Sequence, residues 1–144
     1  MVKLINKASI SSTPLILALP SNIKIEKIIT TGKKYLGTPY KLGATPFKTD
    51  KFDCSSFIQY IFAKNGIKLP RKSTQQALYG TSIEFNNLKR GDLLFFYTKR
   101  TKGIGHVAIY LGKNKILHAC RKKGVSYASL EKWKKKLLLI KRIV

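Results

Sequence analysis

The sequence predicts an α+β fold, in which helices come first along the chain and antiparallel strands follow. Apolar residues recur at helical spacing twice in the first half, over residues 23–36 and after Cys54. Compact apolar runs at residues 93–97, 106–112 and 116–120 are typical of strands. With 144 residues, 44% of them hydrophobic, the chain suits one compact domain with a sizeable core.

We expect this domain to cover residues 23–144, preceded by a separate segment at residues 1–22. The apolar core of the segment is short and is broken by Pro14, so it is too short to span a membrane. Two interpretations stay open, a signal-like sequence for export or a disordered N-terminus. The segment contains no Cys, so a lipid-anchored N-terminus is not expected.

The chain is strongly basic, because 29 Lys and Arg stand against 6 Asp and Glu for a formal net charge of +23. Such a charge indicates an anionic partner: nucleic acid, anionic lipid or an acidic polymer. The basic residues are mostly Lys and are spread along the whole chain, so compositional drift explains them equally well. No nucleic-acid-binding motif is present and the aromatic residues follow core periodicity, which argues against a nucleic-acid partner.

Cys54 is the candidate nucleophile of the chain. Asp53 is a good N-cap residue, so Cys54 falls in the first helical turn, where free N–H groups and the helix dipole favour a thiolate. Apolar residues then recur at spacings of three and four and anchor the helix: Phe57, Ile58, Ile61 and Phe62. A Gly- and Pro-rich loop at residues 37–46 brings Tyr40 just ahead of this helix. Considered alone, a cysteine at a helix start is more often structural than catalytic.

The two histidines of the chain, His106 and His118, fall on the two strands of one predicted hairpin. With regular pairing, a three-residue loop at residues 113–115 would place them on one face, whereas a two-residue loop would separate them. A cysteine nucleophile needs a base, and the base needs a third polar group that holds its orientation. The histidines are therefore candidates for both roles, although each alone is also an ordinary strand residue.

Three shorter elements complete the predicted fold. Ser73 is the expected cap of a short helix, with Gln76 three residues later as in a capping box. Residues 130–133 predict a short helix or turn, and residues 137–140 predict a final strand.

Cysteine and histidine usage argues against a metal centre. Cys54 and Cys120 are too few for a disulfide scaffold, and no C-x-x-C or His/Cys cluster at zinc-ligand spacing occurs. We therefore expect no metal.

Six motifs occur in order along the chain. They are Gly-Thr-Pro-Tyr at 37–40, Phe-Asp-Cys-Ser-Ser-Phe at 52–57, Leu69-Pro70-Arg71 with Ser73 and Gln76, Arg-Gly-Asp-Leu-Leu-Phe-Phe at 90–96, His-Val-Ala-Ile-Tyr-Leu-Gly at 106–112 and Leu117-His118-Ala119. In this order they resemble the NlpC/P60 family of cell-wall cysteine peptidases. The resemblance runs from about residue 25 to the C-terminus. Any one motif is weak, whereas six in sequence are highly specific.

The resemblance implies a reduced papain-like α+β fold, with the Cys-bearing helix packed on an antiparallel sheet of about five to six strands. By position, Cys54 would be the nucleophile, His106 the general base and acid, and His118 the residue that orients His106. Tyr40 would belong to the oxyanion region. The resemblance implies no cofactor.

The resemblance also implies a substrate, the stem peptides of peptidoglycan, usually cut between D-γ-glutamyl and a diamino acid. Asp53, Arg71 and Ser73 fall where family members that recognise a stem-peptide N-terminus place polar groups. The chain departs from the usual pattern at Leu42-Gly43-Ala44, where Trp-Gly-Gly is common, and at Ser56, where Gly is common. Both departures bear on substrate preference more than on chemistry.

The family further implies a location in the cell envelope, periplasmic or secreted, where the basic surface would attract anionic polymers. Oligomeric state stays open, with a monomer as the default. Two other functions are weighed: a papain-like lipid acyl hydrolase or acyltransferase, and a non-catalytic basic module that binds an anionic polymer. The order of the motifs, with Cys54 before both histidines, argues against the first.

Overall fold

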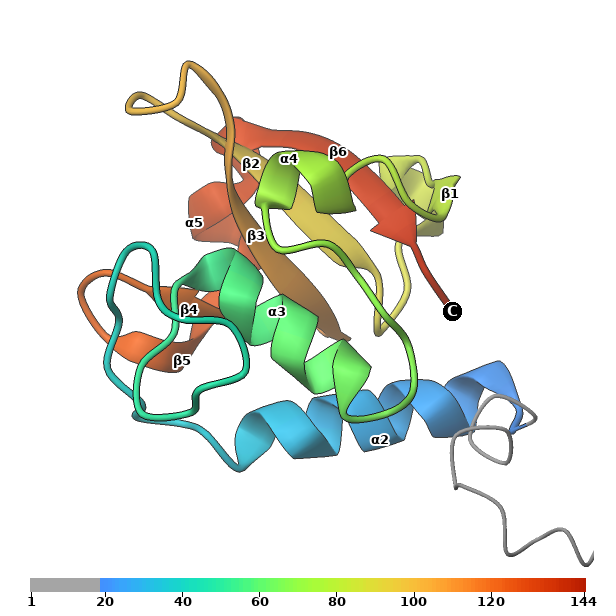
Figure 1. Cartoon of the computed structure of the whole chain (residues 1–144). Helices are drawn as coiled ribbons and strands as arrows, with labels where there is room; N and C mark the ends of the chain where they lie inside the picture. Colours follow the sequence, from blue (N-terminus) through green and yellow to red (C-terminus); the bar gives the residue numbers. More distant parts are fainter. Residues whose placement is uncertain (1–18) are drawn as a thin grey trace, which may run out of the picture.

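The computed structural model describes residues 19–144 and confirms the predicted α+β order (Figure 1). Almost all of the separate segment expected at residues 1–22 lies outside the described residues. The elements are α2 (Ser21–Lys33), α3 (Cys54–Ala63), α4 (Ser73–Gln76), β1 (Thr81–Ser82), η2 (Phe85–Asn87), β2 (Leu93–Thr98), β3 (Gly103–Gly112), β4 (Lys115–Cys120), β5 (Gly124–Ser129), α5 (Leu130–Trp133), η3 (Lys134–Lys136) and β6 (Leu137–Arg142). Within residues 19–144, no helix is long and apolar enough to cross a membrane.

The six strands form one sheet in the order β1-β6-β2-β3-β4-β5, and every neighbouring pair is antiparallel. Alternate residues of β2 enter two different cores, because successive side chains of a strand point to opposite faces. Leu93 and Phe95 join the core under α2 and α3, whereas Leu94 and Phe96 join the core shared with α5. The sheet is thus covered on both faces, and α3 packs on β3 and β4 as predicted.

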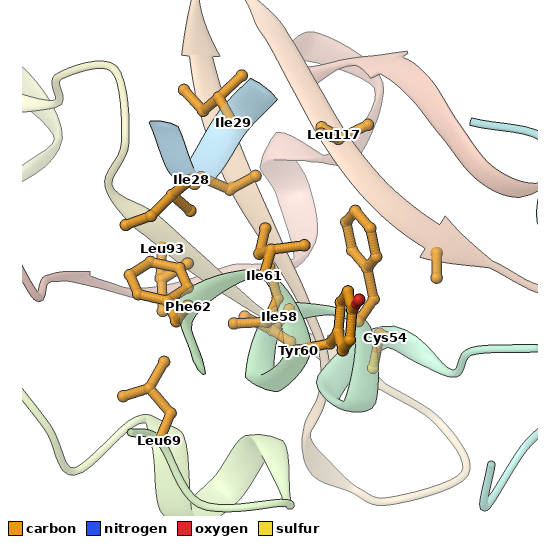
Figure 2. Packing of buried hydrophobic residues seen from close by; sticks show 14 of the residues in the cluster. Ile28, Ile29, Cys54, Ile58, Tyr60, Ile61, Phe62, Leu69, Leu93 and Leu117 are labelled. Atoms are coloured by element: carbon orange, nitrogen blue, oxygen red, sulfur yellow. The ribbon is translucent and has the colours of Figure 1, made fainter. Parts of the chain in front are cut away.

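Helix α3 is the central element of the larger core. Figure 2 shows Ile58, Ile61 and Phe62 of α3 in one cluster with Ile28 and Ile29 of α2. Each of these five side chains is almost completely removed from water, and burial of one such side chain contributes about 2 kcal/mol. Every residue of α3 from its start to Phe62 is buried, because α2 and α4 pack around it as well as the sheet. The position of Cys54 is therefore anchored by the best-packed helix of the fold.

Helix α2 differs from the predicted 23–36, because it begins at Ser21 and ends at Lys33. The chain then turns through Gly37, whose φ of 91° is easily reached only without a side chain. The N–H of Gly37 donates to the carbonyl of Val125, and the N–H of Val125 donates to the carbonyl of Thr38. These bonds attach the loop that follows α2 to strand β5.

The β3–β4 hairpin corrects one expectation. Its turn contains only two residues, Lys113 and Asn114, whose positive φ values of 49° and 63° are those of a type I′ turn. The pairing shifts between Tyr110 and Gly112, so that one residue of β3 bulges out of the ladder. Because the bulge adds one residue, both histidines lie on the same face of the sheet. The expectation that a two-residue loop would separate them is wrong, since it assumed regular pairing.

Candidate active site

Cys54 is the first residue of α3, and Asp53 is its N-cap as predicted. The Asp53 carboxylate accepts the N–H of Ser56 at 2.9 Å, and the Ser56 hydroxyl accepts the N–H of Asp53 at 3.0 Å. The pair forms a complete capping box, which fixes the first helical turn. Ser56, the residue at which the chain departs from the family pattern, therefore stabilises the first turn of α3.

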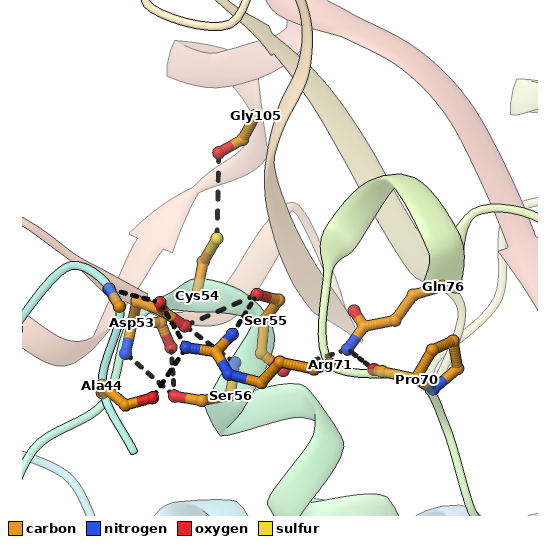
Figure 3. A network of polar contacts seen from close by, with 10 residues as sticks. Ala44, Asp53, Cys54, Ser55, Ser56, Pro70, Arg71, Gln76 and Gly105 are labelled. Atoms are coloured by element: carbon orange, nitrogen blue, oxygen red, sulfur yellow. Dashed lines mark hydrogen bonds and ion pairs between the residues drawn. The ribbon is translucent and has the colours of Figure 1, made fainter. Parts of the chain in front are cut away.

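The sulfur of Cys54 lies against the start of strand β3. Its Sγ donates to the carbonyl of Gly105 at 3.8 Å (Figure 3). The N–H of Val107 is a second neighbour of the sulfur. These two residues flank His106 in the chain. Gly105 is required at this point, because a Cβ there would collide with the side chains of Thr98 and Thr101.

Burial dominates the ionisation of Cys54. The residue is only 6% exposed, and burial raises the pKa of its thiol to about 11. The N–H groups of Val107 and Ser55 act in the opposite direction but do not overcome this effect. The first turn of the helix thus favours the thiolate as expected, but burial outweighs this effect, so the thiol stays protonated at neutral pH and needs a base.

The two histidines form a buried pair with each other, His106 on β3 and His118 on β4. Nε2 of His106 lies 2.8 Å from Nδ1 of His118. The ring of Trp133 stacks on His106, with centroids 4.7 Å apart and an interplanar angle of 21°, and meets His118 edge-on at 5.2 Å and 82°. Phe96 also contacts the His106 ring, with centroids 5.9 Å apart. Both imidazoles are thus held by aromatic side chains from β2 and α5.

Both histidines are neutral near pH 7. Burial, with the neighbouring His118 and Lys136 acting in the same direction, lowers the pKa of His106 to about 3. Burial also lowers the pKa of His118 to about 4. A neutral imidazole is able to accept a proton, so His106 has the protonation state that a general base requires.

Cys54 lies in a cleft of about 620 Å³. The loop at residues 40–46 forms one wall, the start of α4 a second, and the β2–β3 hairpin a third. The lining residues are Tyr40, Leu42, Gly43, Ala44, Pro46, Asp53, Cys54, Ser55, Arg71, Lys72, Ser73, Thr74, Arg100, Thr101, Ile104 and Gly105.

Tyr40 is positioned by an isolated parallel bridge to Phe52, just before the N-cap of α3. Burial raises the pKa of its phenol, and the charges of Cys54 and Asp53 act in the same direction, against Arg121 and Arg100. Tyr40 therefore keeps its proton at neutral pH and is a hydrogen-bond donor in the cleft.

Asp53 and Arg71 form an ion pair at the base of the cleft, with Nη2 and Oδ2 2.7 Å apart. Arg71 also donates to the hydroxyl of Ser55 and to the carbonyl of Ala44, both at 2.8 Å (Figure 3). Burial opposes the charge of Asp53, but the hydrogen bonds from Arg71 and from the N–H of Ser56 hold the pKa of the carboxyl below its usual value. The pair joins the loop at Ala44 to the start of α3.

Ser73 lines the cleft as the first residue of α4, but it is not the cap of that helix. The N-cap is Lys72, and no side-chain capping bond forms. The capping box expected here is wrong, because Gln76 uses its amide elsewhere. Its Nε2 donates to the carbonyl of Ser55 at 3.0 Å and to that of Pro70 at 2.8 Å, which ties α4 to α3.

Sequence reasoning missed three residues of the site: Gly105, Trp133 and Arg100. Gly105 stood in a predicted polar loop, and Trp133 in a predicted short helix. Trp133 is the only tryptophan of the chain, and this is the one sequence feature that could have indicated its importance. Both cysteines are free. In the part of the chain that the structure describes, no three His, Cys, Asp or Glu residues gather as a metal site would need.

A helix that presents a cysteine at its N-terminus to a histidine-bearing antiparallel sheet defines the papain-like class of α+β folds. The match to known proteins is more specific. The model of the NlpC/P60 family matches residues 37–142, and the chain belongs to this family.

Two relatives and one solved structure illustrate the similarity. The γ-D-glutamyl-L-lysine dipeptidyl-peptidase of Bacillus subtilis strain 168 is 43% identical over 95 residues, which are 65% of this chain and 31% of that protein. The peptidoglycan DL-endopeptidase CwlO of Bacillus licheniformis strain ATCC 14580 is 39% identical over 120 residues, which are 77% of this chain and 26% of that protein. The chain thus spans less than a third of either relative.

The solved structure is that of an NlpC/P60 family protein from Bacillus cereus ATCC 10987. It superimposes with a TM-score of 0.75 at 32% identity, over 83% of this chain and 40% of that chain.

Proposed function

We propose that the protein is a cysteine peptidase that hydrolyses an amide bond in the stem peptides of peptidoglycan, between D-γ-glutamyl and a diamino acid. One observation carries this proposal. The sulfur of Cys54 lies against the backbone on both sides of His106, at the base of a cleft wide enough for a peptide. The names of the two Bacillus relatives support the substrate class.

Cys54 is the nucleophile in this proposal, and His106 is its base. Nε2 of His106 is engaged with His118, so Nδ1 is the nitrogen left for the thiol proton. Nδ1 accepts a proton only in the tautomer that carries its hydrogen on Nε2. His118 must therefore accept at its own Nδ1, and by doing so it selects the reactive tautomer of His106.

The reaction then follows the order of nucleophilic catalysis. The thiolate that forms as the proton leaves attacks the amide carbon, and His106 later gives the proton to the departing amine. The backbone N–H of Cys54 has no partner within its helix, since it belongs to the first turn. Together with the Tyr40 phenol it supplies donors for the oxyanion. Water, deprotonated by His106, then releases the acyl group.

Four residues form the acyl side of the cleft in this proposal: Tyr40, Asp53, Arg71 and Ser73. The Asp53–Arg71 pair holds the wall in place, and Ser73 lines the same cleft. We place the enzyme in the cell envelope, where this substrate is found, and its charge of +23 favours binding to anionic envelope polymers.

The test is incubation of the reduced protein with defined muropeptides, followed by mass spectrometry of the products. Native protein and a Cys120→Ala variant should cleave, whereas a Cys54→Ala variant should not. Cys120 is the matched control, because it is the other free cysteine of the chain. The product masses identify the bond. If reduced native protein cleaves no stem peptide, the proposal fails.

A further inference from the structure

The charges on the walls of the cleft are unevenly compensated. Asp53 is the only carboxylate among the lining residues. It accepts from Arg71, from the N–H of Ser56 and from the N–H of Gly43. Its negative charge is therefore neutralised before any substrate arrives.

The charge of Arg71 is compensated in the same way, because its guanidinium donates hydrogen bonds to Asp53, Ser55 and Ala44. Two other cations line the cleft, Lys72 at the start of α4 and Arg100 in the β2–β3 loop. Neither takes part in an ion pair with any of residues 19–144. The free cleft is thus electropositive, and the charge comes from two facing walls.

The loop that carries Arg100 is internally bonded. Hydroxyls of Thr98 and Thr101 lie 2.7 Å apart, the Thr101 hydroxyl donates to the carbonyl of Gly103 at 2.9 Å, and the N–H of Lys102 donates to the carbonyl of Thr98 at 2.9 Å. Such a turn holds its backbone in one conformation. Arg100 is therefore presented from a fixed support and not from an unstructured loop.

The two cations lie on different walls of the cleft. Lys72 is next to Arg71 and Ser73, on the wall that receives the acyl part of the substrate. Arg100 belongs to the hairpin that continues through Gly105 into His106. Since His106 protonates the departing amine, the leaving residue must lie on the hairpin side of Cys54.

We propose that Arg100 binds a free carboxylate of the leaving residue, so that the enzyme cleaves bonds to a diaminopimelate-type residue in preference to a lysine-type one. This inference rests on the proposed function. The two leaving residues carry the same side-chain ammonium, but only diaminopimelate adds a carboxylate next to it. A lysine-type residue would bring an uncompensated cation toward Arg100, whereas the added carboxylate forms a charge-assisted bond with the guanidinium.

The experiment compares three peptides that differ only in the leaving residue: diaminopimelate, diaminopimelate with that carboxylate amidated, and lysine. For the native enzyme we expect kcat/KM to be about tenfold higher for the first peptide than for the other two. In an Arg100→Gln variant, kcat/KM should fall for the diaminopimelate peptide alone, so that the preference is lost. A Lys99→Gln variant is the matched control, because it removes one charge from the neighbouring exposed position without altering the cleft lining.

The outcomes separate the two proposals. If the native enzyme cleaves all three peptides at similar rates, or if Arg100→Gln lowers all three equally, the inference about Arg100 is overturned and the proposed function stands. If the native enzyme cleaves none of the three peptides, the inference about Arg100 and the proposed function are both wrong.

Discussion

His106 and His118 share one hydrogen bond, 2.8 Å long, between Nε2 of the first and Nδ1 of the second. The bond exists because a one-residue bulge in β3 compensates a two-residue turn, which returns both side chains to one face. The role that we propose for His118 requires only an acceptor at the position of its Nδ1.

A substitution that keeps this acceptor should therefore keep most of the activity. In His118→Asn the side-chain oxygen takes the place of Nδ1, and we expect kcat/KM on a cleavable muropeptide to fall less than about tenfold. In His118→Leu the acceptor is lost, and the fall should reach about a hundredfold or more. Thermal unfolding of both variants serves as the control for folding. Equal activity of the two variants would show that His118 does not orient His106.

The pH dependence of kcat/KM should report the low pKa of His106. Since the reactive form is the neutral imidazole and its pKa lies at about 3, activity should persist well below pH 6.5, where an ordinary histidine is half protonated. We expect little loss between pH 7 and pH 5 for protein that remains folded. A midpoint of the acid limb at or above pH 6.5 would contradict the neutral, buried base.

The same burial makes stability depend on pH. The folded-state pKa values of His106 and His118, about 3 and about 4, lie below the unfolded value of 6.5. Between these pH values the unfolded state binds more protons than the folded state, so the free energy of unfolding rises with pH. The stability that the neutral histidines contribute is lost progressively as the pH falls below 6.5. The slope approaches about 1.4 kcal/mol per pH unit for each proton.

Urea denaturation at pH 7, 6 and 5 measures this slope. A His118→Asn variant provides the comparison, since it removes one of the two titrating groups and should lower the slope. Stability that stays constant over this range would show that the histidines are not buried as neutral groups.

Local chemistry explains which parts of the site were predictable from the sequence. The cap at Asp53 and the spacing of Phe57, Ile58, Ile61 and Phe62 act within a few residues of Cys54, so the helix and its N-terminal cysteine follow from neighbours in the chain. The hairpin that carries the histidines is also local. The bulge is not, because it depends on how β3 and β4 align over their whole length.

Tertiary contacts explain the remainder. The pKa of the Cys54 thiol is raised because β3 covers the sulfur. No residue close to Cys54 in the sequence indicates that this strand packs against it. Trp133 reaches His106 from α5, 27 positions later in the chain. Such contacts join distant segments, and no periodicity in either segment indicates them.

The ion pairs Asp53–Arg71 and Glu26–Arg90 differ in burial and should therefore differ in their contribution to stability. Asp53 is 7% exposed in its pair with Arg71, whereas Glu26 is 54% exposed in its pair with Arg90. Arg71→Ala leaves a buried carboxylate without its cation and should cost about 2 kcal/mol. Arg90→Ala should cost less than about 1 kcal/mol, since exposed pairs contribute little. Equal losses in urea denaturation would show that Arg71 is not required to neutralise Asp53.

Trp133 should control the protonation of His106 as well as its position. The indole stacks on one face of the imidazole and excludes water from it, and burial is the largest cause of the low pKa of His106. Trp133→Leu keeps an apolar side chain but uncovers part of the ring. We therefore expect the acid limb of kcat/KM to move to higher pH, and kcat/KM at pH 7 to fall about tenfold as the ring loses its support.

Trp133→Phe is the matched variant, because it retains an aromatic face over His106 and should retain most of the native pH profile. A uniform fall in activity for the Leu variant, without any movement of the acid limb, would limit Trp133 to a packing role. A shift of the acid limb to higher pH in Trp133→Leu, absent from Trp133→Phe, would identify the aromatic face over His106 as the group that keeps the base neutral.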